Sequence, residues 1–307
     1  MNLTISTAPH IRCKDSVKTI MRDVLIALLP TTAAGIYLFG LNSALIVAVS
    51  VASAVLVEFV WQKLAKRPVR VKDLSAAVTG LIFALNLPPT APWWMAMIGS
   101  AFAIIVVKQL FGGIGDNFLN PALAARALLL ASWPARMTQF VLPTYFSGAD
   151  AVSSATVLSE SGLQARYIDM FLGRIPGTIG EVCKVAILIG FAYLLIRRVI
   201  SWQVPVIILA VVALLSYIFG SDPLTAILSG GVMFGAVFMA TDYTTSPMTA
   251  KGQIIFAVGI GVIIVLIRKF GSYPEGVTYA ILFMNIVAPL IDKYVAPRLY
   301  GEVKKHA

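Results

Sequence analysis

The residues most able to take part in chemistry form a short run at 152–159, with the sequence VSSATVLS. Thr156 and Ser159 carry hydroxyls three residues apart, and Ser153 and Ser154 stand just before them. Their small neighbours leave room for another protein to reach a hydroxyl. Taken alone, however, the pattern is weak, and a polar loop without a chemical function is the simpler interpretation of its composition.

The chain offers few residues that could bind a metal. Its cysteines, Cys13 and Cys183, are far apart and form no CxxC pair, and its histidines, His10 and His306, stand near the two ends. Metal sites need clustered ligands of these types. We therefore expect no zinc site, no iron–sulfur cluster and no bis-histidine haem from this chain alone.

Composition indicates a membrane protein. Hydrophobic residues make up 59% of the 307 residues and charged residues 12%, whereas soluble domains carry about 25% charged residues. The net charge of +10 does not indicate nucleic-acid binding, because basic residues of membrane proteins collect in cytoplasmic loops. The expected class is an all-α integral membrane protein in a lipid bilayer.

About ten segments approach the length of about 20 apolar residues that a transmembrane helix needs. They are expected at 22–40, 42–61, 74–90, 93–111, 118–133, 182–200, 202–219, 224–240, 253–268 and 276–294. Lys and Arg are concentrated at 12–22, 63–72 and 293–305. The excess of basic residues on the cytoplasmic side then predicts that both termini are cytoplasmic.

The two halves of the chain resemble each other. Asp73 and Asp222 each begin an apolar span, and Phe-Gly pairs at 111–112 and 270–271 stand at matching places. An odd number of helices per half turns the second half upside down, as in many transporters. We expect two inverted repeats of five helices each.

This division gives a repeat at 1–133, an outward-facing segment at 134–181 and a second repeat at 182–307. The third helix of each repeat looks interrupted, by LNLPPTAP at 85–92 and by MATDYTTSP at 239–247. Broken helices leave backbone groups unpaired at membrane depth, which is tolerated where they line a cavity. Ordinary turns at the bilayer surface explain the two runs equally well.

Ionisable residues inside the spans are the first candidates for an ion path. Glu58 lies within the second span and Arg126 within the fifth, whereas Asp73 and Asp222 stand at span ends, where a carboxylate needs no function. The Thr-rich stretch 241–249 could offer oxygen ligands to sodium. These residues do not distinguish sodium from protons.

Longer motifs give a resemblance to a known family. The chain carries GGIGDNFLNPA at 112–122, FMATDYTTSP at 238–247 and GSYPEG at 271–276. It resembles the family of the D subunit of the Rnf ion-translocating electron transport complex. More distantly, it is similar to the B subunit of the sodium-pumping NADH:quinone reductase. The resemblance covers nearly all of residues 1–300.

This resemblance implies a covalent flavin. In that family a flavin transferase joins FMN through a phosphoester to a Thr in a motif similar to SGAT. Here the acceptor would be Thr156, with Ser153, Ser154 and Ser159 beside it, and Ser154 stands where the family usually has Gly. A metal-free chain would then still carry a redox group.

The resemblance also implies a second, non-covalent flavin, riboflavin, within the helix bundle. No motif locates it. Our expectation is the region of the interrupted helices, around Asn86, Asn120 and Asp242.

The implied function is that of a membrane subunit of an Rnf-type ferredoxin:NAD oxidoreductase, whose activity resides in the whole complex. It would relay electrons coupled to sodium or proton translocation. Its partners would be a second subunit with covalent FMN, iron–sulfur subunits and the flavin transferase. The expected location is the cytoplasmic membrane of a bacterium or archaeon, with the flavin loop outside. The alternative is a cofactor-free inverted-repeat channel or secondary transporter.

Overall fold

The computed structural model describes residues 16–143, 166–271 and 276–295. All its regular elements in these ranges are helices, which agrees with the all-α prediction. The run at 152–159, and with it Ser153, Ser154, Thr156 and Ser159, lies outside the described residues.

The helices fall into two series joined by short elements. The first series is α1 (Val17–Phe39), α2 (Leu41–Leu64), η1 (Val71–Asp73), α3 (Ser75–Leu85), α4 (Trp93–Phe102), η2 (Ala103–Gln109) and α5 (Pro121–Ser132). The short elements are α6 (Pro134–Met137) and α8 (Tyr167–Leu172). The second series is α9 (Lys184–Ile196), α10 (Gln203–Ile218), α11 (Pro223–Leu228), α12 (Val232–Phe234), η3 (Gly235–Met239), α13 (Ala250–Phe270) and α14 (Val277–Val295).

Every expected span coincides with a helix or a broken helix of this series. Among the described residues, four helices are long and apolar enough to cross a membrane on their own: α1, α2, α13 and α14. The others are shorter apolar helices. The chain is an all-α integral membrane protein.

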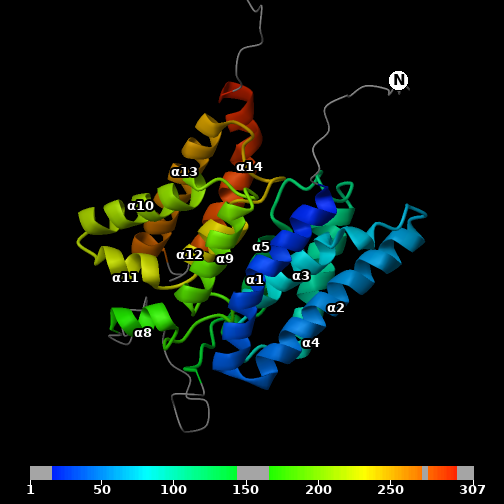
Figure 1. Ribbon diagram of the computed structural model, residues 1–307, viewed down its shortest axis with the longest axis horizontal. Coiled ribbons are helices and arrows are strands. Elements are labelled where there is room, and N and C mark those ends of the chain that lie inside the picture. The colour runs from blue at the N-terminus through cyan, green and yellow to red at the C-terminus, as the bar shows by residue number, and fades with distance from the viewer. Residues whose placement is uncertain (1–15, 144–165, 272–275, 296–307) are drawn as a thin grey trace, which may run out of the picture.

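The two series pack in the same way. The second helix of each series contacts the third and fourth, so that α2 lies on α3 and α4 while α10 lies on α11 and α13. Across the centre α1 packs on α9 and α5 packs on α14 (Figure 1). The two series therefore share a packing pattern, while the inverted five-plus-five repeat stays a prediction.

Both ends of the described chain lie on one side of the molecule. The end of α14 is at the top of Figure 1 and the start of α1 lies in its upper half, whereas α8 lies in the lower half. This arrangement fits an even number of crossings.

Side-chain caps fix where several helices begin. Ser16 caps α1 and accepts from the Thr19 N–H, Asn120 caps α5, and Thr249 caps α13 by accepting from the Gly252 N–H. Such caps satisfy backbone N–H groups that have no partner within a helix. The polar residues at these span ends therefore stabilise helix starts.

The third helices are interrupted in both series. Helix α3 stops at Leu85, where the first Pro-rich run begins. In the second series α11 ends at Leu228, and α12 begins only at Val232 because Gly230 adopts the left-handed region, with φ of 63°. The predicted run at 239–247 does follow η3, but this earlier break was not predicted.

Part of the segment 134–181 that was expected to form an outward loop is buried. Residues 175–182 are all buried. The Ile179 N–H donates to the Leu87 oxygen at 3.1 Å, and the Gly180 N–H donates to the Leu85 oxygen at 2.8 Å. These bonds satisfy carbonyl groups that the end of α3 leaves without a helical partner.

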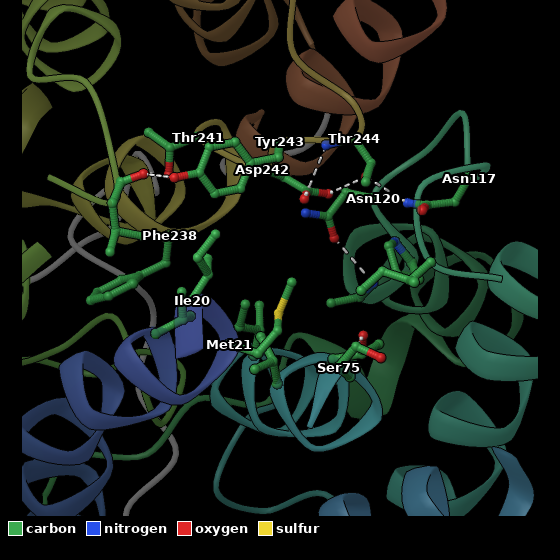
Figure 2. Close-up of a pocket in the computed structure, with 18 of the residues that line it drawn as sticks. Ile20, Met21, Ser75, Asn117, Asn120, Phe238, Thr241, Asp242, Tyr243 and Thr244 are labelled. Carbon is green, nitrogen blue, oxygen red and sulfur yellow. Dashed lines mark hydrogen bonds between the residues drawn. The ribbon is translucent and has the colours of Figure 1, made fainter. Parts of the chain in front are cut away.

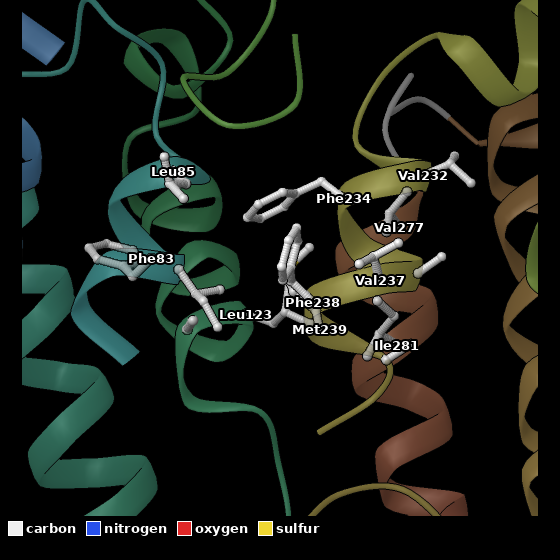
Figure 3. Packing of buried hydrophobic residues seen from close by; sticks show 14 of the residues in the cluster. Phe83, Leu85, Leu123, Val232, Phe234, Val237, Phe238, Met239, Val277 and Ile281 are labelled. Atoms are coloured by element: carbon white, nitrogen blue, oxygen red, sulfur yellow. The ribbon is translucent and has the colours of Figure 1, made fainter. Parts of the chain in front are cut away.

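An apolar core separates the two interrupted helices. Phe83 and Leu85 of α3 lie on one side and Phe234 and Phe238 of α12 and η3 on the other (Figure 3). The Phe234 and Phe238 rings lie 5.3 Å apart between centroids. Phe238 also lines a cavity that contains polar side chains.

Candidate functional site

A cavity lies between the two series of helices. Its lining comes from α1, α3, η2, the connection before α5, the end of α9 and the segment 237–244. Ser75, Lys108, Asn120 and Asp242 supply polar groups to it (Figure 2). We call it the central cavity, and its open volume is about 100 Å³.

The central cavity brings together two predicted site residues, Asn120 and Asp242. The Asn117 side chain donates to the Thr244 hydroxyl at 3.0 Å, and that hydroxyl donates to the Asp242 carboxylate at 3.1 Å. The Asn120 amide donates to the Met239 carbonyl at 3.4 Å. A polar chain thus joins the two repeats at this point.

Asn120 and Asp242 differ in their local surroundings. The Asn120 oxygen accepts from the Ala122 and Leu123 N–H groups and so caps α5. Asp242 lies in the connection between η3 and α13, outside the helices. Burial raises the pKa of its carboxyl, and hydrogen bonds from Thr244 act in the opposite direction.

Asn86, the third residue expected near a flavin, lies in a different environment. It is buried, and its oxygen accepts from Arg126 at 3.0 Å. Its amide donates to the Ile82 oxygen at 2.7 Å and contacts the Met239 sulfur at 3.3 Å. Asn86 and Arg126 therefore tie α3, α5 and η3 together.

Glu58, the acidic residue predicted within the second span, forms a buried ion pair with Lys108. The Lys108 nitrogen lies 3.0 Å from the Glu58 Oε1 atom, and the two residues are only 3% and 1% exposed. Gln109 and Gln62 also donate to that oxygen, at 2.6 and 3.2 Å. Sequence reasoning did not pair these residues because they are far apart in the chain.

The two carboxylates at span ends stabilise helix starts in both repeats. Asp73 accepts from the Ser75 N–H at 2.9 Å, and Asp222 accepts from the Thr225 N–H at 2.8 Å. Hydrogen bonds from Thr225 lower the pKa of the Asp222 carboxyl below its ordinary value. Both carboxylates thus cap the start of a helix, and their lack of any further function stays a prediction.

Comparison with known proteins gives one consistent result. The model of the NQR2, RnfD, RnfE family matches residues 4–301. The D subunit of a sodium-translocating ferredoxin:NAD⁺ oxidoreductase complex from Acetobacterium woodii is 50% identical over 100% of this chain and 98% of its own length. The D subunit of a proton-translocating ferredoxin:NAD⁺ oxidoreductase complex from Clostridium ljungdahlii is 42% identical over 97% of this chain and 96% of its own length.

A third relative, the D subunit of an ion-translocating oxidoreductase complex from Halorhodospira halophila, is 37% identical over 96% of this chain and 95% of its own length. These matches run through both helix series and the segment between them. They confirm the resemblance to the D subunit of the Rnf complex. The chain therefore belongs to the NQR2, RnfD, RnfE family.

Proposed function

We propose that the chain is the D subunit of an Rnf-type ferredoxin:NAD⁺ oxidoreductase and relays electrons in a complex that translocates sodium ions or protons. The full-length similarity to D subunits of such complexes is the observation that carries the proposal. The redox activity belongs to the whole complex.

The redox group proposed for this chain is FMN, linked to Thr156 by a phosphoester. Support comes from the run at 152–159, which holds the acceptor hydroxyl among small side chains. The proposal includes a flavin transferase as the maturation partner. A second subunit with covalent FMN and iron–sulfur subunits would exchange electrons with this flavin.

We infer the orientation of the chain in the membrane from the distribution of its basic residues. With Lys and Arg concentrated at 12–22, 63–72 and 293–305, we assign the end that holds the start of α1 and the end of α14 to the cytoplasm. The segment with Thr156 then lies on the outer side of a bacterial or archaeal cytoplasmic membrane, where a transferase can reach it.

Riboflavin is proposed as a second cofactor without an assigned site. Asn120 and Asp242 offer hydrogen-bonding groups in the central cavity, but its open volume is about 100 Å³. Pockets for organic ligands enclose about 300–1,000 Å³. A flavin ring would therefore require neighbouring side chains to move.

A cofactor-free channel or secondary transporter is the second candidate. The matched helix contacts and the interrupted third helices favour it, because such features occur in transporters. Fold alone does not decide function. The two candidates differ in whether electron flow is needed for ion movement.

Inverted membrane vesicles that hold the complex test this difference. With reduced ferredoxin and NAD⁺ supplied, the proposal predicts NADH formation together with uptake of ²²Na⁺ or acidification of the vesicle interior. Replacing Thr156 by Ala should abolish both, since electron flow is interrupted. Ion uptake that continues at the same rate without ferredoxin would support the channel and contradict the proposal.

A further inference from the structure

Lys108 lies where two cavities meet. The central cavity is lined by Lys108 and Ser75. A second cavity of about 140 Å³, which we call the end cavity, is lined by Glu58, Gln62 and Asp73. Of the buried pair, Glu58 therefore lines the end cavity and Lys108 lines the central cavity.

The Lys108 ammonium sits among oxygen atoms in the way that a small hard cation does. Its nitrogen lies 3.0 Å from Glu58 Oε1, 3.3 Å from Glu58 Oε2 and 2.5 Å from the Ser75 hydroxyl oxygen. The Ser75 hydroxyl donates to Asp73 at 2.7 Å, so its oxygen lone pairs remain available to a cation. Three oxygens from two side chains therefore surround one positive charge.

The helix that carries Lys108 has an unusual local form. Residues Ala103–Gln109 form the π-helix η2. Such helices are rare in proteins, and those that occur are often found at functional sites. In η2 the adjacent residues Lys108 and Gln109 both contact the Glu58 carboxylate. Two neighbouring side chains of this wider helical turn therefore converge on one carboxylate.

The charged residues around the end cavity determine what kind of ion could replace the Lys108 ammonium. Its ionisable lining residues are the acids Glu58 and Asp73 and the bases Arg67 and Arg70. These four charges cancel, so Lys108 supplies the one net positive charge of the group. One monovalent cation at Glu58 would restore that charge if the ammonium left.

We propose that Glu58 and Ser75 form a binding site for a sodium-sized monovalent cation, and that the Lys108 ammonium is a tethered competitor that closes it. When the Lys108 side chain swings into the central cavity, its amino group approaches Asp242, which lines the same space. A cation from the end cavity then takes its place on Glu58. This inference rests on the proposed function and names the ion class and the side chain that admits it.

Removing the competitor tests the site. In the purified complex, Lys108→Met leaves the Glu58 carboxylate without its cation, and bound sodium should replace it. We expect ²²Na⁺ to bind at least about tenfold more tightly than to wild type, within the range of about 5–150-fold typical of coupled sites. The thermal unfolding midpoint of the variant should rise in sodium chloride relative to choline chloride of equal ionic strength, because ligand binding stabilises the folded state.

Three variants make the result specific. Lys108→Met combined with Glu58→Gln removes the carboxylate too and should lose the sodium response. Arg197→Met is the control, since it removes a cation beside a different buried carboxylate, Asp23, which keeps Arg22 and Tyr193 nearby. Lys108→Gln provides a second route if Lys108→Met accumulates poorly, and a higher yield of folded protein in sodium than in choline is then the expected outcome.

Equal melting of both Lys108 variants in sodium and choline, or a sodium response that survives Glu58→Gln, would overturn the inference. Failure to recover either Lys108 variant even in sodium would overturn it as well. Covalent flavin content and NAD⁺ reduction by wild type are measured separately, so failure of the electron-transfer proposal is distinguishable from failure of the cation site.

Discussion

Gly180 determines how closely the buried segment 175–182 approaches the end of α3. A Cβ atom built on Gly180 would lie 2.6 Å from the Leu85 Cβ atom and 3.0 Å from the Leu85 oxygen. Both atoms belong to a buried helix end that cannot move aside alone. At this scale a single missing methyl group permits the two hydrogen bonds that satisfy the end of α3.

Replacing Gly180 by Ala should destabilise the protein by about 1–3 kcal/mol, the usual cost of overpacking a core. The matched control is Gly259→Ala, whose new Cβ would meet only the side chain of Met284, which is flexible and can adapt. Thermal unfolding of both variants in detergent measures the difference. Equal unfolding midpoints would mean that the segment does not pack on α3 as described.

At the scale of elements, an ion pair between Asp23 and Arg197 links α1 to the end of α9. Asp23 of α1, with a side chain 5% exposed, lies 2.9 Å from an Arg197 nitrogen just after α9 and accepts from Tyr193 at 3.3 Å. The two helices belong to different repeats. This contact therefore helps to hold the repeats together beside the central cavity.

A double-mutant cycle of Asp23→Asn and Arg197→Met should give a coupling energy near 1 kcal/mol. The estimate is the upper end of about 0.2–1 kcal/mol for exposed pairs, because Arg197 is 45% exposed and solvent screens it. Unfolding free energies of the four variants supply the value. If the single effects simply add, within about 0.3 kcal/mol, the ion pair does not join the repeats.

At the scale of the whole molecule, both described ends lie on one side and α8 on the other (Figure 1). Ile168 of α8 is 69% exposed, and Lys251 at the start of α13 is also exposed. These two positions report opposite sides of the membrane in the proposed topology.

Single cysteines at these positions test the topology, in a chain whose Cys13 and Cys183 have been replaced. A membrane-impermeant maleimide added to intact cells should label Ile168→Cys and leave Lys251→Cys unlabelled until the cells are opened. Labelling of Lys251→Cys in intact cells would reverse the assigned orientation.

The sequence predicted what depends on local composition. Hydropathy located the spans, and Pro in the run at 85–92 and the polar run at 239–247 marked where the third helices stop. Contacts between distant residues were not predictable in this way. Lys108 of the π-helix η2 meets Glu58 of α2 although the two residues are 50 positions apart, and a run of apolar residues gives no sign of that contact.

Two further features escaped prediction for related reasons. The break at 229–231 depends on the left-handed conformation of Gly230, which a glycine permits and does not require. Burial of 175–182 depends on carbonyl groups that α3 exposes at its end. Asn120 and Asp242 were named from motifs, and the structure brings them to one cavity.

The intact mass and in-gel fluorescence of the denatured protein, produced together with its flavin transferase, test the central claim most directly. We predict a mass gain of one FMN less one water and flavin fluorescence in wild type, with both absent from Thr156→Ala. A signal that persists in the variant would move the acceptor to a neighbouring hydroxyl, Ser153, Ser154 or Ser159. An unmodified wild-type protein would contradict the account of this chain as a flavin-carrying electron relay.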